Sequence, residues 1–397
     1  MAEDGQLQFG AAATQGGVRD HNERLLLSMI NRMGAVSGSE LARLAGLSAQ
    51  TVSVILRSLE RDGLLERGVP QKGRVGKPSV PMALAADGTF SVGLKIGRRS
   101  ADLALMDFHG TVRDQLQVHY RYPLPGDVFE FVRRGLVTLL GPLPADLRAR
   151  VCGIGIAAPF EIWKWNEALG APHDDFRAWR DVDFVRDVHA VSGLDVTVIN
   201  DATAACMAEN ALGEGPGFRD YAYVFIGSFI GGGIVLNGSV FDGPHGNAGG
   251  FGPIRSQRPD GSAAPLLDTA SLYLLEDAIT AAGGDPTRLW TGARDWTEFA
   301  PQLDVWIHRT GTAIGRALVS VCSVIDFPAV VIDGAVPPAV RARLTDRVRE
   351  SLGDLDTRGL VIPVIQEGRI GENARAIGAA YAPIAARYLV GPTGVQP

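Results

Sequence analysis

The sequence predicts an α/β protein in which a winged helix-turn-helix head precedes a larger body of two lobes. Three observations support this fold class. Residues 18–88 show helical patterns joined by a short turn and followed by a basic hairpin. In residues 89–397, short strands followed by alternating helices and strands occur twice. Adjacent glycine-rich loops lie in the second repeat, beside the cleft expected between the lobes.

Residues 1–17 are polar and rich in glycine and alanine, which is typical of a flexible tail. No apolar run reaches the length of a membrane span, and the N-terminus lacks a signal-peptide pattern. Cys152, Cys206 and Cys322 lie far apart between apolar residues, which predicts buried thiols and neither disulfides nor a zinc site. We therefore expect a cytoplasmic protein with no membrane partner.

The charge of the chain is unevenly distributed. Val18–Gly88 carries ten Lys or Arg and seven Asp or Glu, a net charge of +3, and the tail before it carries −2. Because the whole chain carries −6, the remainder must carry −6 − 3 + 2 = −7. A basic head on an acidic body favours a polyanionic partner for the head, although so small an excess needs support from a motif.

Apolar residues recur at helical spacing in His21–Met33, which predicts the first helix of the head. Ser37 or Ser39 is placed to cap a second helix over Glu40–Ala45. A third helix is expected after the turn at residues 46–48.

The third helix, Ala49–Asp62, would bury Val52, Ile55 and Leu59 and expose a polar face. This pattern is typical of a helix-turn-helix, in which Gln50 and Thr51 would contact base edges of double-stranded DNA. The alternative is a small three-helix bundle with no role in DNA binding. The DNA-binding residues predicted on this element are Ser48, Gln50, Thr51, Ser53 and Arg57.

The segment Gly68–Pro78 follows a strand that opens at residues 64–65. It is basic and punctuated by glycine, as expected of a wing, and this favours the DNA-binding interpretation over the bundle. Arg74 and Lys77 are predicted to contact phosphates or a minor groove.

The body repeats one plan. The strands expected in the first repeat are Ser91–Ile96, Ala101–Asp107, Thr111–His119, Val151–Ala157 and Asp195–Ile199, with helices over Val128–Leu140 and Asp181–Ser192. Those expected in the second are Tyr221–Ile226, Gly232–Leu236, Ser239–Phe241, Val330–Asp333 and Val361–Val364, with a long helix over Asp304–Ile325. We predict one lobe at about 89–199 plus the C-terminal helix, and another at about 200–375.

Glycines cluster in Gly227–Gly233 and Gly243–Gly252, on either side of a hairpin turn at Asn237-Gly238. Such loops suit a backbone that approaches a small ligand closely, although glycine also merely permits tight turns. Asn200-Asp201 follows a strand at the mouth of the expected cleft. Its carboxylate would bind a ligand hydroxyl, cap the following helix, or do both.

The Gly227–Gly238 segment resembles the second phosphate loop of the ROK family (repressor, open reading frame, kinase). Gly243–Gly252, with its Ala-Gly pair at 248–249, resembles the sugar loop of that family. The head resembles the winged helix of ROK repressors, in which a leading Arg and Asn recur, as Arg19 and Asn22 do here. The resemblance implies an actin/sugar-kinase-like (ribonuclease-H-like) fold for nearly all of the body, with Asp201 at the position of the kinases' catalytic base.

Three departures argue against catalysis. The first phosphate loop of ROK kinases, Asp-x-Gly-x-Thr, is here Lys95-Ile96-Gly97-Arg98-Arg99. The Gly-Glu-x-Gly-His of the sugar loop is here Gly249-Gly250-Phe251-Gly252-Pro253. The segment Ile254–Asp268, where the family has a zinc site, contains neither Cys nor His. We therefore predict no catalytic residues, no metal and no cofactor.

The hypothesis is a DNA-binding transcriptional regulator, a repressor of carbohydrate-utilisation genes. It would bind operator double-stranded DNA as a homodimer or homotetramer and respond to a sugar or sugar-derived effector. The predicted ligand-binding residues are Asn200, Asp201, His245, Gly246, Asn247, Gly249 and Asp268.

Two alternatives remain at this point. One is an active ATP-dependent sugar kinase with a fused DNA-binding head, favoured by Asp201 and the Gly231–Gly233 loop. The other is a constitutive DNA-binding protein with a vestigial pocket. The cations Lys95, Arg98 and Arg99 also have two interpretations: they attract an anionic ligand such as a sugar phosphate or sugar acid, or the two arginines point into solvent.

Overall fold

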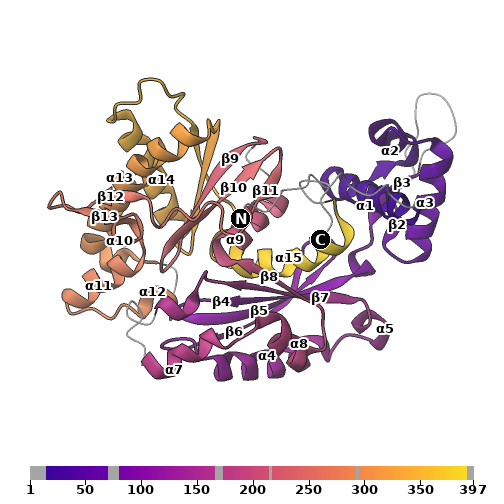
Figure 1. The fold of residues 1–397 in the computed structure, drawn as a ribbon, viewed down its shortest axis with the longest axis horizontal. Helices are drawn as coiled ribbons and strands as arrows, with labels where there is room; N and C mark the ends of the chain where they lie inside the picture. The colour runs from indigo at the N-terminus through magenta and orange to yellow at the C-terminus, as the bar shows by residue number, and fades with distance from the viewer. Residues whose placement is uncertain (1–14, 70–79, 166–172, 214–216, 292–294, 391–397) are drawn as a thin grey trace, which may run out of the picture. The chain divides into compact units, whose positions relative to one another are not determined.

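The structure, a computed structural model, describes residues 15–69, 80–165, 173–213, 217–291 and 295–390 (Figure 1). The chain forms two compact units. The head comprises the residues up to Thr89 together with those from Ala385 onward, and the body comprises Phe90–Ile384. None of the helices in the described ranges is long and apolar enough to cross a membrane.

The head contains the predicted helix-turn-helix. Its elements are α1 (Gln15–Met33), β1 (Val36–Ser37), α2 (Gly38–Ala45), α3 (Ala49–Arg61), β2 (Leu65–Arg67), β3 (Pro81–Leu84) and a 3-10 turn, η1 (Ala86–Gly88). The Ser37 hydroxyl accepts a hydrogen bond from the backbone N–H of Glu40 and caps α2. Gly46 then takes a left-handed conformation, with φ of 65°, and turns the chain toward α3.

The strands β2 and β3 are antiparallel and flank residues 70–79. The sheet order is β1-β3-β2, and the sequence did not reveal β3. The predicted wing residues Arg74 and Lys77 lie outside the described residues.

The head also includes the end of the C-terminal helix. The Arg24 guanidinium donates hydrogen bonds to the carbonyl oxygens of Leu389, at 2.8 Å, and Ala386, at 3.1 Å. The backbone N–H of Val390 donates to the Ser28 hydroxyl at 2.8 Å. These contacts attach the last turn of that helix to α1.

Each lobe of the body is built on a five-stranded sheet, and the two orders correspond. The first sheet has the order β6-β5-β4-β7-β8 and the second β11-β10-β9-β14-β15. In both, three antiparallel strands are followed by two parallel ones, so the predicted repeat is confirmed. The strands are β4 (Phe90–Ile96), β5 (Ser100–Asp107), β6 (Val112–His119), β7 (Val151–Ala158), β8 (Val196–Asn200), β9 (Tyr221–Ile226), β10 (Ile230–Leu236), β11 (Ser239–Phe241), β14 (Ala329–Gly334) and β15 (Val364–Glu367).

The helices of the body cover both sheets. They are α4 (Pro125–Leu140), α5 (Ala145–Arg148), α7 (His173–Arg177), α8 (Phe184–Ser192), α9 (Asp201–Leu212), α10 (Leu267–Ala270), α11 (Tyr273–Ala281), α12 (Arg288–Thr291), α13 (Ala300–Val324), α14 (Pro338–Gly353) and α15 (Ala374–Tyr388). Short 3-10 turns, η2 (Ile162–Trp165), η3 (Ala178–Arg180), η4 (Thr297–Phe299) and η5 (Gly371–Asn373), and a small hairpin, β12 (Arg255–Gln257) with β13 (Ala263–Pro265), complete it.

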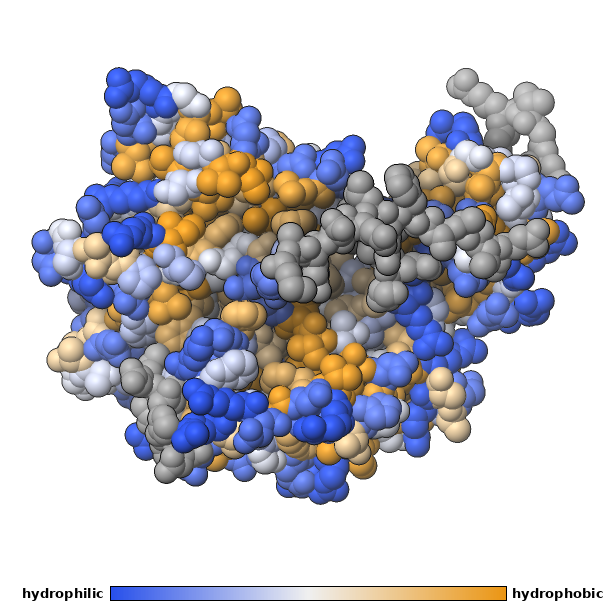
Figure 2. All heavy atoms as spheres, in the orientation of Figure 1, coloured by the Kyte–Doolittle hydropathy of each residue, from blue (hydrophilic) through white to orange (hydrophobic). Residues whose placement is uncertain are grey.

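Figure 1 shows α4 and α8 on one face of the first sheet and α15 on the other. On the α15 side, Ala157, Ala204 and Ala379 form a cluster that joins β7, α9 and α15. The packing is close: a Cβ atom at Gly155 would lie 1.9 Å from the carbonyl oxygen of Ala379. In Figure 2 hydrophilic side chains cover much of the visible surface of the body, as expected where residues contact water. Cys152, Cys206 and Cys322 are buried, as predicted.

One strand prediction and one loop prediction were wrong. β15 begins at Val364, where its pairing with β14 begins, whereas Val361 and Ile362 are 71% and 52% exposed in the loop before it. The strand predicted over Gly232–Leu236 is part of β10, but the loop predicted at Gly231–Gly233 is not formed, because these glycines lie within β10 and pair with β9.

Candidate functional site

The candidate nucleic-acid interface is the exposed face of α3. Gln50, Ser53 and Arg57 are exposed there, as predicted. Ser48 is the N-cap of the helix: its hydroxyl accepts from the backbone N–H of Thr51 at 3.1 Å and lies 2.8 Å from the Thr51 hydroxyl. Both of these hydroxyls therefore interact within the first turn of the helix, whereas Gln50, Ser53 and Arg57 are exposed, with Nε of Arg57 donating to the Ser53 carbonyl oxygen at 3.0 Å.

Sequence reasoning missed Val54, which is 52% exposed and lies four residues after Gln50 on the same face of α3. An exposed Val on a recognition helix can contact a thymine methyl group. Arg19 has a structural role: it pairs with Glu23 at 2.9 Å, and its Nη2 lies 3.4 Å from the Ser58 hydroxyl of α3.

The candidate ligand site lies between the lobes of the body and consists of two adjoining cavities. The smaller, of about 60 Å³, is bordered by Asp201 of α9 and by Phe229 and Gly231 around the start of β10. The larger, of about 230 Å³, is bordered by Lys95, Arg99 and Asp102 of the first lobe and by Trp290, Ala335 and Pro337 of the second. Arg98, Ser228 and Arg375 border both cavities.

Asn200 caps a helix, whereas Asp201 faces the cleft. The Asn200 side chain caps α9, accepting from the backbone N–H groups of Ala202 at 2.9 Å and Thr203 at 3.3 Å. The Asp201 carboxylate accepts from Nη1 of Arg375 at 3.2 Å. The capping interpretation therefore applies to Asn200, and the Asp201 carboxylate borders the cavity.

Lys95 has its own counter-ion. Its ammonium group is buried and lies 2.6 Å from Oδ2 of Asp102 and 2.7 Å from the Ser100 hydroxyl. Burial lowers the pKa of Lys95, and the Asp102 carboxylate opposes this shift. Lys95 stands where ROK kinases have the Asp of their first phosphate loop. That position is therefore occupied here by a buried Lys95–Asp102 ion pair.

Arg98 and Arg99 do not point into solvent, so that interpretation was wrong. The Arg98 side chain is 11% exposed, and its guanidinium lies 5.6 Å from the ring centre of Phe229 and 5.8 Å from that of Tyr273. Arg99 donates a short hydrogen bond to the buried carboxylate of Glu276, from the second lobe. Both arginines therefore lie in the cleft.

Residues 91–385 match the ROK family, and residues 20–74 match the MarR family. The chain belongs to the ROK family. Its fold is that of a ROK transcriptional regulator: a regulator of this family, a homologue of the E. coli MLC protein, superposes with a TM-score of 0.68, over 93% of this chain and 96% of that one, at 23% identity.

The ROK family contains regulators and kinases. The "Uncharacterized protein y4fQ" of Sinorhizobium fredii is 26% identical over 93% of this chain and 92% of its own length. The xylose repressor of Bacillus subtilis is 25% identical over 60% of this chain, and the match spans 62% of the repressor, less than two thirds. The N-acetylmannosamine kinase of Escherichia coli is 27% identical over 62% of this chain and 83% of the kinase.

The glycines of the ROK-like loops serve close packing. A Cβ atom at Gly249 would lie 2.5 Å from Cα of Gly233, and one at Gly232 would lie 2.4 Å from the Phe251 ring. These glycines let the Gly243–Gly252 loop lie directly on β10. Close packing of the backbone, which neither interpretation of these glycines anticipated, therefore explains Gly232 and Gly249, while Gly231 borders the smaller cavity.

The other predicted ligand residues lie elsewhere. His245 is exposed, and neither it, Gly246 nor Asn247 is among the described residues that border the two cavities. Asp268 borders a separate cavity on the second lobe and lies 3.3 Å from Arg258. Of the predicted set, only Asp201 borders the cleft cavities.

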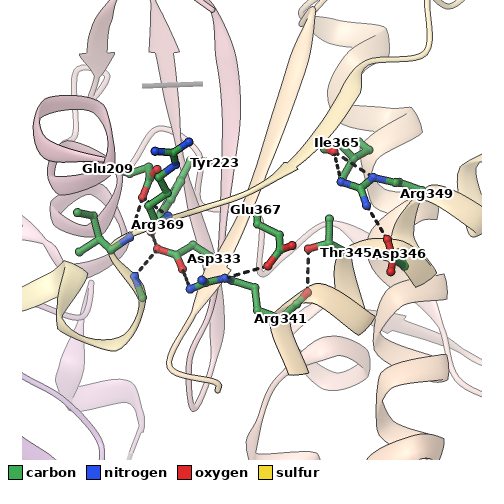
Figure 3. Close-up of polar contacts among 12 residues, drawn as sticks. Glu209, Tyr223, Asp333, Arg341, Thr345, Asp346, Arg349, Ile365, Glu367 and Arg369 are labelled. Atoms are coloured by element: carbon green, nitrogen blue, oxygen red, sulfur yellow. Dashed lines mark hydrogen bonds and ion pairs between the residues drawn. The ribbon is translucent and has the colours of Figure 1, made fainter. Parts of the chain in front are cut away.

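Arg375 was missed, because it follows Asp201 by 174 positions and no local pattern marks it. Two buried carboxylates hold the chain just before it (Figure 3). Glu209 accepts from the backbone N–H groups of Arg369, at 2.9 Å, and Ile370, and Asp333 accepts from that of Gly371 at 3.0 Å. Burial raises the pKa of Glu209, while the two backbone donors lower it.

Proposed function

We propose that this ROK protein is a transcriptional repressor of carbohydrate-utilisation genes. The head binds operator DNA through α3 and the segment after β2, and the body binds a sugar or sugar-derived effector at Asp201 without phosphorylating it. One observation carries the proposal: a helix-turn-helix with an exposed polar face is joined to a kinase-like body whose first phosphate loop is occupied by the Lys95–Asp102 ion pair. The xylose repressor among the relatives supports a sugar effector.

Control of DNA binding by the effector requires that it bind one arrangement of the protein more tightly than another. A homodimer or homotetramer is the assembly we propose, because paired recognition helices read two operator half-sites one helical turn apart. The end of α15 offers a physical connection, since the same helix carries Arg375 near its start and contacts Arg24 of α1 at its end.

The first prediction concerns DNA recognition. In the full-length protein, Gln50→Ala should relax the base preference at one operator position. The expected loss of discrimination between bases is about 1–3 kcal/mol, because glutamine pairs with adenine through its amide. Arg57→Gln should weaken binding to all sequences and reduce the salt slope by about 1, as expected for a phosphate contact. The measurement is fluorescence anisotropy with an operator library at several salt concentrations.

Arg358→Gln is the matched control for this experiment, because Arg358 is an exposed arginine of the body, with a side chain 91% exposed. It should leave affinity and sequence preference unchanged. If neither α3 variant altered binding more than this control, the assignment of α3 as the recognition helix would be wrong.

The second prediction is that the body does not transfer phosphate. A kinase needs a carboxylate near the magnesium ion and open loops around the phosphates, whereas here Lys95 is ion-paired and Arg98 lies in the cleft. With ATP, magnesium and a panel of sugars, the wild type should show no turnover. Lys95→Asp should show none either, because the two arginines remain. Wild-type turnover near a usual kinase rate, about 1 per second or more, would support the kinase alternative instead.

A further inference from the structure

Several residues that border the larger cavity of the cleft carry unpaired hydrogen-bond donors. Five buried nitrogen atoms of residues that border it have no hydrogen-bond partner within the described part of the chain: Nε and Nη1 of Arg98, Nε of Arg99, Nε1 of Trp290 and Nε of Arg375. All five are N–H donors. A buried donor without a partner lowers the stability of the protein. A cavity bordered by residues with several such donors is therefore suited to a ligand with several acceptor oxygens.

The charges that border this cavity are also unbalanced. Lys95, Arg98, Arg99 and Arg375 contribute four positive charges, and Asp102 and Glu372 two negative ones, giving 4 − 2 = +2. Two carboxylates approach from outside this set. Asp201 accepts from Arg375 at 3.2 Å, and Glu276 bonds Arg99 but lies 3.8 Å from Nη1 of Arg98, too far for a hydrogen bond.

Arg98 is therefore the cation with the least compensation in the cleft. Burial lowers the pKa of Arg98, and the neighbouring Arg99 cation adds to this effect, while Glu276 opposes it. An anion placed against Arg98 would satisfy its free donors and offset the cost of burying its charge.

We propose that the larger cavity is an oxyanion subsite and that the effector is an anionic sugar derivative, a sugar phosphate or a sugar acid. This deepens the proposed function and rests on it. The anionic group binds Arg98 and Arg375, and the hydroxyl groups extend toward Asp201. The two cavities are neighbours, since Arg98, Ser228 and Arg375 border both, and this supports a single ligand that reaches from one to the other.

The first test uses inorganic phosphate as the probe, because phosphate needs only the subsite. Calorimetric titration of the full-length protein at constant ionic strength should show saturable binding. Arg98→Gln should weaken it about tenfold or more, the effect expected for a lost charge-assisted hydrogen bond. Arg98→Lys, which keeps the charge but loses the planar fork, should bind with intermediate affinity. The control Arg358→Gln should match the wild type.

The second test compares glucose with glucuronate and glucose 6-phosphate. Both anions should bind more tightly than glucose, and Arg98→Gln should remove that advantage, while Asp201→Asn should weaken the sugar derivatives but not inorganic phosphate. Absence of saturable binding by all anions, or anion binding that Arg98→Gln leaves unchanged, overturns the inference.

Operator binding distinguishes the inference from the proposed function. Release of operator by glucose at least as effective as that by the anions supports sugar control and overturns the anion subsite. Binding of anions through Arg98 with no effect of any sugar derivative on operator affinity supports the subsite and contradicts effector control.

Discussion

Gly378→Ala is expected to destabilise the body by about 3 kcal/mol, because the new methyl group has no space. A Cβ atom there would lie 1.8 Å from the carbonyl oxygen of Ala204 in α9, and backbone cannot rotate away as a side chain would. The separation of α15 from α9 must increase, which would also displace Arg375 at the start of α15 from Asp201. Denaturant unfolding followed by fluorescence and by circular dichroism measures the loss.

Two further variants make this prediction specific. Gly155→Ala tests the packing of the same helix against β7, because its Cβ atom would lie 1.9 Å from the carbonyl oxygen of Ala379, and it should destabilise comparably. Gly126→Ala lies in α4, where no atom is within 4 Å of the added carbon, and it should leave stability equal or slightly increased. Equal unfolding midpoints for all three variants would refute the close packing of α15.

Asp333→Ala is expected to cost about 3–5 kcal/mol, because it leaves a buried arginine without its principal counter-ion. The Asp333 carboxylate is fully buried and accepts from Nη1 of Arg341 at 3.1 Å, from the Tyr223 hydroxyl at 2.9 Å and from the backbone N–H of Gly371 (Figure 3). The Glu367 carboxylate, 3.5 Å from Nε of Arg341 and 38% exposed, is a longer and more solvated partner.

From highest to lowest, the expected unfolding midpoints are those of the wild type, Tyr223→Phe and Asp333→Ala. The Tyr223 variant ranks second because it loses only a single neutral donor. Asp356→Ala is the matched control: it removes the carboxylate of an exposed ion pair, 2.5 Å from Arg358, and should change little. A midpoint for Asp333→Ala as high as that of this control would show that Arg341 finds another partner. It would also show that Asp333 does not position the chain before Arg375.

The parts of the fold that could be predicted depend on short-range patterns. Ser37, Ser48 and Gly46 act on backbone groups within a few residues, so the helix-turn-helix follows from local sequence. The central strands β4, β7, β9 and β14 are buried along nearly their whole length and are mostly apolar, and their repeated order made the two lobes recognisable. The strand predicted to begin at Val361 was wrong, because apolar residues of the kind typical of strands lie there in an exposed loop.

The sequence by itself determined the head, the doubled α/β body and the position of Asp201 at the end of a strand, because these are set by periodicity and by residues close together in the chain. The tertiary structure decided what surrounds that carboxylate. Arg375 reaches it from the C-terminal helix, and Glu276 reaches Arg98 and Arg99 from the other lobe. The same packing shows that Gly232 and Gly249 serve backbone contact. Contacts between distant segments depend on how helices and sheets pack, and no spacing along the chain encodes them.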